Sequence, residues 1–240
     1  MRVMGGIPAL VERREGDVMS KDAPNADTLA GHLSALFQAL ADAYGVHPWN
    51  WHTKGDPFRV LVGTLLSHRT RDAKTDEAAR ALLDRYGTAK DLAEAPVEHI
   101  ASLVRPVNFY KTKARRIKEV ARCLVTRHGG HVPDQAAELM ALPGVGPKTA
   151  ACVLVYGFRK PAIPVDVHVH RISNRLGLVA TRTPQETQKA LERCIPDGWL
   201  LHVNELLVKH GQTTCLPRHP KCDRCAVRLW CAMGRNGLSH

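Results

Sequence analysis

The 240-residue sequence lacks any run approaching the roughly 20 consecutive apolar residues that a helix needs to cross a bilayer. Residues 5–11 are too few for the apolar core of a signal peptide, and a charged Glu-Arg-Arg-Glu run follows them. These absences argue against an integral membrane protein and against a secreted one. We therefore expect a cytoplasmic protein without a signal segment, a transmembrane segment or a membrane partner.

Aromatic side chains are scarce at 5%, and acidic side chains are outnumbered, with 23 Asp and Glu against 34 Lys and Arg. The resulting net charge of +11 predicts a polyanionic partner, most often a nucleic acid. The alternative interpretation is that the basic balance only aids solubility. Hydrophobic residues make up 44% of the chain, which is enough to build a core.

The seven cysteines do not form a disulfide framework. Three lie singly in segments with a helical pattern, where they are expected to be small buried residues: Cys123, Cys152 and Cys194. The other four are closely spaced as Cys215-x6-Cys222-x2-Cys225-x5-Cys231. Such spacing can place four thiolates around one inorganic centre, and thiolate sulfur selects zinc or an iron–sulfur cluster.

Most of the sequence has the spacing of amphipathic helices. In residues 112–128 apolar residues recur at steps of three and four with Lys and Arg between them, and Gly129 is expected to end this helix. Similar segments are expected near 28–44, 58–67, 74–86, 97–104, 134–141, 147–157, 184–194 and 198–210. The fold class predicted from this pattern is all-α.

One segment is ambiguous. Residues 164–170 alternate apolar and polar side chains, which by period alone favours a strand. Alternatively, Asp166 is the N-cap of a helix that continues to Leu176. We favour the helix because the sequence offers no second strand to pair with this one.

The segment 142–150, Leu-Pro-Gly-Val-Gly-Pro-Lys-Thr-Ala, joins two helical segments. Gly144 and Gly146 allow backbone conformations closed to other residues and a close approach to a ligand, and Pro147 suits a first helical turn. The N–H groups at the start of the second helix then favour a phosphate, without reading bases. The competing interpretation is an ordinary turn between helices.

The hairpin, Asp166 about twenty residues after it and the four-cysteine spacing together resemble the endonuclease III and adenine-glycosylase branch of the helix–hairpin–helix–Gly/Pro–Asp DNA glycosylases. The resemblance runs from about residue 30 to Cys231. It implies a [4Fe–4S] cluster on the four cysteines, and a zinc ribbon remains the alternative.

The resemblance also implies roles for residues of the hairpin region. Lys148 stands where endonuclease III relatives carry the lysine that attacks C1′ of the damaged nucleotide, and Asp166 where they carry the carboxylate that stabilises positive charge as the base departs. Without the family, Lys148 could equally contact phosphate, and Asp166 could be a plain N-cap. His168 matches a pocket histidine, whereas Val167 departs from the common Thr.

A glycosylase takes its target out of the base stack, and something must fill the gap. Arg69 occupies the position of a gap-filling Gln in many relatives, and Phe109 that of a wedging Leu. Phe109 could instead be a core residue. The catalytic Glu of adenine-glycosylase relatives is absent near Thr64. In the cluster loop, Arg218 and Lys221 are expected to face the DNA backbone.

The function implied is a bifunctional DNA glycosylase and AP lyase of base excision repair, acting on oxidised or ring-saturated pyrimidines. Its partner would be double-stranded DNA with damaged bases or abasic sites, bound by a monomer that associates with the nucleoid if the source is prokaryotic. A monofunctional mismatch or adenine glycosylase and a non-catalytic iron–sulfur DNA-binding module remain alternatives.

The fold implied is two-lobed. Residues 50–160 would form a helical bundle that contains the helix–hairpin–helix at about 135–157. Residues 28–49 and 161–240 would form the second domain with the cluster loop 215–231, and residues 1–27 a flexible tail.

Overall fold

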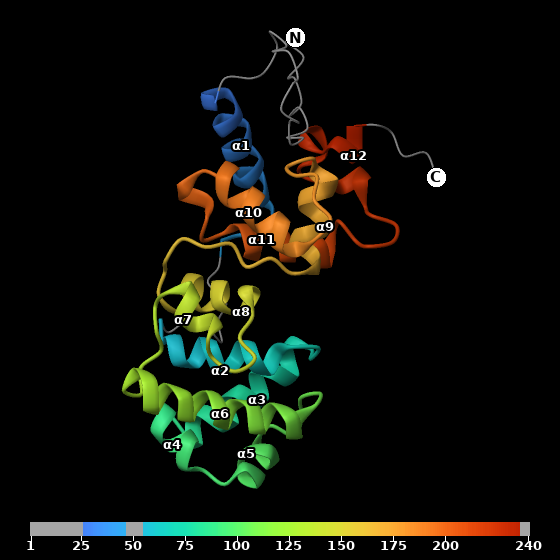
Figure 1. Cartoon of the computed structure of the whole chain (residues 1–240). Helices are drawn as coiled ribbons and strands as arrows, with labels where there is room; N and C mark the ends of the chain where they lie inside the picture. The colour runs from blue at the N-terminus through green and yellow to red at the C-terminus, as the bar shows by residue number, and fades with distance from the viewer. Residues whose placement is uncertain (1–25, 47–54, 236–240) are drawn as a thin grey trace. The chain divides into compact units, whose positions relative to one another are not determined.

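The computed structural model describes residues 26–46 and 55–235, in which every regular element is a helix or a helical turn (Figure 1). The all-α prediction is confirmed. The predicted tail, 1–27, lies outside the described residues except for its last two, which belong to the first helix. No helix in the described part of the chain is both long enough and apolar enough to span a membrane.

The described residues form two compact units, divided between residues 46 and 47 and between 164 and 165. We call the unit of residues 55–164 the hairpin unit, and the unit of residues 26–46 and 165–235 the cluster unit. The domain boundaries predicted from the sequence lie within a few residues of these divisions. Whether each part is an independent domain stays a prediction.

The hairpin unit is built on the long amphipathic helix α6, Tyr110–His128. Its other helices are α2 (Pro57–Ser67), α3 (Asp72–Arg85), α4 (Ala89–Glu94), α5 (Val97–Leu103), α7 (Ala136–Met140) and α8 (Pro147–Cys152). Helix α6 presents Ile117, Val120 and Leu124 to a core against α4 and α5. It ends at Gly129, whose left-handed backbone lets its N–H bond to the carbonyl of Leu124, as the sequence predicts.

Helix α8 continues into a π-helical turn, Val153–Gly157, which packs against α2. A Cβ at Gly157 would lie 2.8 Å from the backbone of Pro57, so only glycine permits this approach. The glycine thus sets how closely the second hairpin helix and α2 lie together.

The cluster unit consists of α1 (Ala26–Tyr44), α9 (Val167–Leu176), α10 (Pro184–Cys194), α11 (Val203–Thr213) and α12 (Ala232–Arg235). Helix α11 lies between α1 and α9, and its residues Leu206 and Leu207 are fully buried. Residues 222–224 and 228–230 form short 3₁₀ turns in the cluster loop. The helical interpretation of residues 166–176 is confirmed, since no strand pairs there and α9 begins after Asp166.

Candidate functional site

The hairpin lies between α7 and α8, with Leu142 and Val145 buried beneath it. Gly144 has a left-handed backbone, φ +71°, and a Cβ there would collide with the guanidinium of Arg116. Gly146 is the N-cap of α8 at φ −96° and ψ 179°, where a Cβ would meet nothing. The expectation of a special backbone is therefore right for Gly144 and wrong for Gly146.

Lys148 is the second residue of α8, directly after Pro147. Its side chain is half-buried and donates no hydrogen bond to any residue that the structure describes. The next residue, Thr149, is buried, and its Oγ1 lies 3.2 Å from Nε2 of His68 at the end of α2. Burial, followed by the charges of Lys148 and Lys113, lowers the pKa of His68. Lys148 thus lies close enough to the His68 imidazole for its charge to disfavour protonation of that ring.

Arg69 and Phe109 lie in two loops of the hairpin unit, and both have left-handed backbones, with φ of 55° and 58°. Phe109 is 62% exposed, so it is not a core residue. Both side chains line a surface hollow of about 580 Å³ together with Gly144 and Arg116. The structure thus brings three of the residues predicted to contact DNA around one hollow.

Asp166 is the N-cap of α9. Its Oδ1 accepts hydrogen bonds from the backbone N–H groups of His168 at 2.8 Å and Val169 at 2.9 Å. Its Oδ2 accepts none from the described residues, and the neighbouring Val167 is exposed. The carboxylate is therefore oriented through one oxygen, which leaves the other for a ligand. Asp166 and Lys148 belong to different units, and their convergence on one substrate stays a prediction.

His168 packs against α11 within the cluster unit. Its Nδ1 lies 3.3 Å from the guanidinium of Arg171, and a Cβ at Gly211 would come within 2.6 Å of it. The absence of a side chain at Gly211 therefore makes room for the imidazole. Its predicted role in the substrate pocket stays a prediction.

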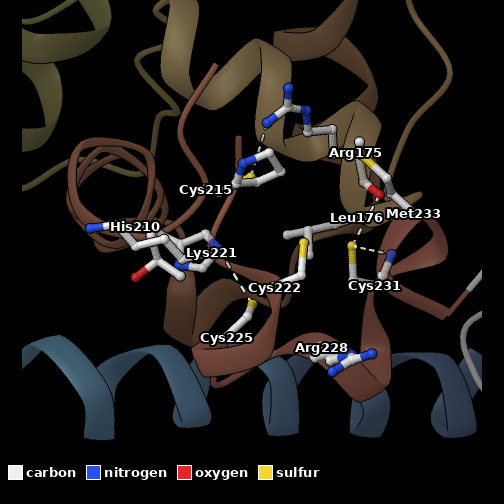
Figure 2. Close-up of a pocket in the computed structure, with 13 residues that line it drawn as sticks. Arg175, Leu176, His210, Cys215, Lys221, Cys222, Cys225, Arg228, Cys231 and Met233 are labelled. Carbon is white, nitrogen blue, oxygen red and sulfur yellow. Dashed lines mark hydrogen bonds between the residues drawn. The ribbon is translucent and has the colours of Figure 1, made fainter. Parts of the chain in front are cut away.

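The four cysteines of the C-terminal loop surround one pocket (Figure 2). Cys215, Cys222, Cys225 and Cys231 direct sulfur toward a shared space. Among the described residues, no group of three or more His, Cys, Asp or Glu side chains is arranged to hold a metal ion. A lone zinc ion requires four ligands meeting at about 2.3 Å from one point. The four thiols line one pocket, and four thiolates are the ligand set of a zinc ion or of an iron–sulfur cluster.

The surroundings of the thiols also fit a positively charged centre. Burial raises the pKa of Cys225 and Cys231, and the neighbouring cysteines oppose ionisation further. A cationic centre reverses this cost, because coordinating thiols are deprotonated outright. Hydrogen-bond donors already face the sulfurs: Arg175 Nη1 lies 3.4 Å from Cys215 Sγ, and the N–H of Gly234 lies 3.3 Å from Cys231 Sγ. Such donors are typical of the shell around sulfur-bound centres.

Arg218 and Lys221 are exposed on the loop between the first two cysteines. The loop bends at His219, whose φ is 52°. Arg175 supports it from α9 by donating to the carbonyls of Leu216 at 2.7 Å and Pro217 at 2.8 Å. The two basic side chains are thus presented on a braced loop.

Sequence reasoning missed three residues around the hollow of the hairpin unit. Lys113 is 9% exposed and bonds to the end of α2, Arg116 lies against Gly144, and His68 contacts Thr149. One signal could have revealed Lys113, because it stands four residues before Ile117 on the apolar face of α6. The positions of Arg116 and His68 depend on tertiary packing.

The family described as HhH-GPD superfamily base excision DNA repair protein matches residues 62–197. Endonuclease III of Thermotoga maritima is 47% identical over 184 residues, which cover 77% of this chain and 86% of that protein. Endonuclease III of Treponema pallidum is 38% identical over 83% of this chain and 94% of its own length.

Among solved structures, a non-covalent endonuclease III–DNA complex aligns with a TM-score of 0.77 and 29% identity, covering 89% of this chain and 98% of that one. A trapped endonuclease III–DNA covalent intermediate aligns with a TM-score of 0.75 and 30% identity, over 89% and 99%. These matches extend over both units described above. The chain belongs to the endonuclease III family of the HhH-GPD superfamily.

Proposed function

We infer that this protein is a DNA glycosylase with AP lyase activity that acts in base excision repair. The observation that carries the inference is the hairpin lysine, Lys148, at the start of α8 in a chain of the endonuclease III family. A primary amine at this place can form the covalent bond to sugar that a bifunctional enzyme requires. A related structure is described as a trapped covalent intermediate with DNA, which supports the same chemistry here.

The proposed substrate is double-stranded DNA with an oxidised or ring-saturated pyrimidine, or with an abasic site. The net charge of +11 and the exposed Arg218 and Lys221 favour a phosphate backbone. The exposed side chains of Arg69 and Phe109 around one hollow favour a duplex from which a nucleotide has been extruded. Arg69 would hydrogen-bond the orphaned base, and Phe109 would fill the stack.

The proposed reaction begins when Lys148 gives up a proton to solvent and its amine attacks C1′ of the nucleotide. The N–C1′ bond forms as the glycosidic bond breaks, and the base leaves with the electron pair and takes up a proton. The C1′–O4′ bond then breaks, O4′ keeps the electron pair and takes up a proton, and the nitrogen of Lys148 forms a Schiff base with C1′. Loss of a proton from C2′ then expels the 3′ phosphate, and water releases the amine. The free oxygen of Asp166 would stabilise positive charge on the sugar during the first step.

The cofactor proposed for Cys215, Cys222, Cys225 and Cys231 is a [4Fe–4S] cluster. When bound, it supplies iron–thiolate bonds that close a loop containing little apolar side chain. Arg175 supports the loop from α9, Arg218 is exposed, and Lys221 is exposed while it also lines the cysteine pocket.

A panel of single-lesion duplexes tests the function, with base release and strand cleavage assayed separately. We expect base release from thymine glycol followed by cleavage, and cleavage of a preformed abasic site. Release of adenine from a G:A pair or thymine from a G:T pair, with none from oxidised pyrimidines, would establish the monofunctional alternative. Duplex binding without base release on any lesion would establish a non-catalytic module.

A further inference from the structure

Lys113 is a buried cation on α6 that belongs to no step of the proposed reaction. Its Nζ donates to the carbonyl of Leu66 at 2.7 Å, to the carbonyl of His68 at 2.7 Å and to Oγ1 of Thr70 at 2.9 Å. An ammonium group has three donors, and all three are used. The carbonyls lie at the end of α2, where a cation also complements the helix dipole.

The same loop is tied a second time from the segment that precedes α6. The side-chain amide of Asn108 donates to the carbonyl of Arg69 at 2.5 Å, and its backbone N–H donates to Oγ1 of Thr70 at 3.2 Å. The loop at the end of α2 is therefore bonded both to the start of α6 and to the residue before Phe109. The Arg69 loop and the Phe109 loop form one hydrogen-bonded body.

This body holds two residues in conformations that L side chains seldom adopt. Arg69 and Phe109 both have φ near +55°, and neither is Gly, Asn or Asp. Such outliers persist only where the surrounding structure fixes them, and they concentrate at functional sites. The ties from Lys113 and Asn108 provide that constraint here.

We propose that Lys113 is a positioning residue that locks the Arg69 loop to the Phe109 loop, so that both side chains enter the DNA as one preformed unit. Only the entry of the two side chains into DNA rests on the proposed function; the coupling of the two loops does not. Lys113 lines the hollow but is only 9% exposed, and the loop uses all three of its donors, so none is left for the substrate. Burial lowers its pKa to about 8, which leaves it an ammonium with three donors at neutral pH.

The first test needs no DNA. Lys113→Met keeps an unbranched apolar side chain out to Cε and removes Nζ with its three donors. In hydrogen exchange, we expect the amides of residues 67–71 and 107–110 to exchange faster together, by about tenfold. The matched control is Lys118→Met, which removes another α6 lysine that donates to a single carbonyl, that of Ala95, away from both loops. Unchanged exchange in either segment, or equal acceleration in both variants, would overturn the coupling.

The second test uses the full protein and a duplex with 2-aminopurine beside thymine glycol. We expect Lys113→Met to lower the extrusion signal and single-turnover base release about tenfold, while cleavage of a single-stranded abasic oligonucleotide stays as in the wild type. That oligonucleotide has no stack to fill, so it reports on Lys148 alone. If cleavage is absent in the wild type, the proposed function fails while the exchange result stands.

A double-mutant cycle separates positioning from a general loss of stability. In a variant that already carries Arg69→Ala and Phe109→Ala, we expect Lys113→Met to reduce base release less than twofold further. An additional tenfold loss in that background would show that Lys113 acts by another route and would overturn the proposal.

Discussion

The two units hold their candidate functional residues in different ways. In the hairpin unit, Lys148 has no hydrogen-bond partner among the described residues, and Phe109 is exposed on a loop. In the cluster unit, Asp166 caps a helix, and Arg175 bonds to the loop that carries the cysteines. Lys148 and Phe109 are therefore free to contact a ligand. Asp166 and Arg175, by contrast, also stabilise the fold.

This difference predicts which substitutions impair function alone and which also lower the stability of the fold. Removing a side chain that makes no hydrogen bond leaves no partner unpaired, so most of the loss falls on substrate chemistry. Removing a cap or a brace leaves backbone groups unpaired, which costs stability as well. Truncation of Lys148 or Phe109 should therefore cost little stability, whereas truncation of Asp166 or Arg175 should cost more.

The largest effect is expected for Lys148→Ala. Without the amine no Schiff base forms, so borohydride trapping on a thymine-glycol duplex should disappear and strand cleavage should fall by about 10³-fold or more. The melting temperature should match that of the wild type, because Lys148 donates no hydrogen bond to the described residues. Persistent trapping would contradict the assignment of Lys148 as the nucleophile. A lower melting temperature would contradict the view that Lys148 contributes little to stability.

Asp166 offers a paired test in the cluster unit. Asp166→Asn and Asp166→Ala should both slow base release by about 10²- to 10³-fold, because each removes the carboxylate charge near the sugar. Asn can still cap α9, whereas Ala cannot, so only the Ala variant should lose about 1 kcal/mol of unfolding free energy. Denaturant unfolding of both variants measures the difference. Equal stabilities would mean that the cap contributes nothing.

The sequence predicted much of this fold because its signals are local. The apolar spacing of residues 112–128 and the glycine at 129 correspond to α6 and its end, and Asp166 caps α9 as expected. Helix α4, Ala89–Glu94, was missed because six residues are too few to show a period, although Thr88 and Asp91 form a capping box there.

The arrangement around the hollow could not be predicted, because it depends on packing between distant segments. Arg69 and Phe109 are forty residues apart in the sequence, and their common body exists through Lys113 and Asn108. The position of Lys113 on the apolar face of α6 is visible in the sequence, but its hydrogen-bond partners are visible only in the structure. The pairing of Lys148 with Asp166 stays a prediction from the resemblance.

An intermediate effect is expected for the brace of the cluster loop. Arg175→Met removes a donor to Cys215 Sγ and leaves the carbonyls of Leu216 and Pro217 without that partner. Changes of this kind around a metal centre typically cost 10- to 100-fold in affinity, so the visible absorbance of the proposed cluster should decay about 10- to 100-fold faster in a chelator. Arg193→Met, on the exposed face of α10, is the control and should decay at the wild-type rate. Equal rates in both variants would show that the brace does not hold the centre.

The smallest effect is expected at Arg218 and Lys221 of the cluster unit, which are exposed like Phe109 of the hairpin unit. Arg218→Glu with Lys221→Glu should weaken duplex affinity about tenfold and lower the slope of log affinity against log salt by about two, since two phosphate contacts are lost. The melting temperature should stay unchanged, because both side chains are exposed, and Arg218→Glu alone should leave the cluster absorbance unchanged, since only Lys221 lines the cysteine pocket. The matched control reverses the same amount of charge on α10, with Lys189→Glu and Arg193→Glu, and should change affinity much less. Equal losses in both double variants would mean that overall charge, and not this loop, attracts the DNA.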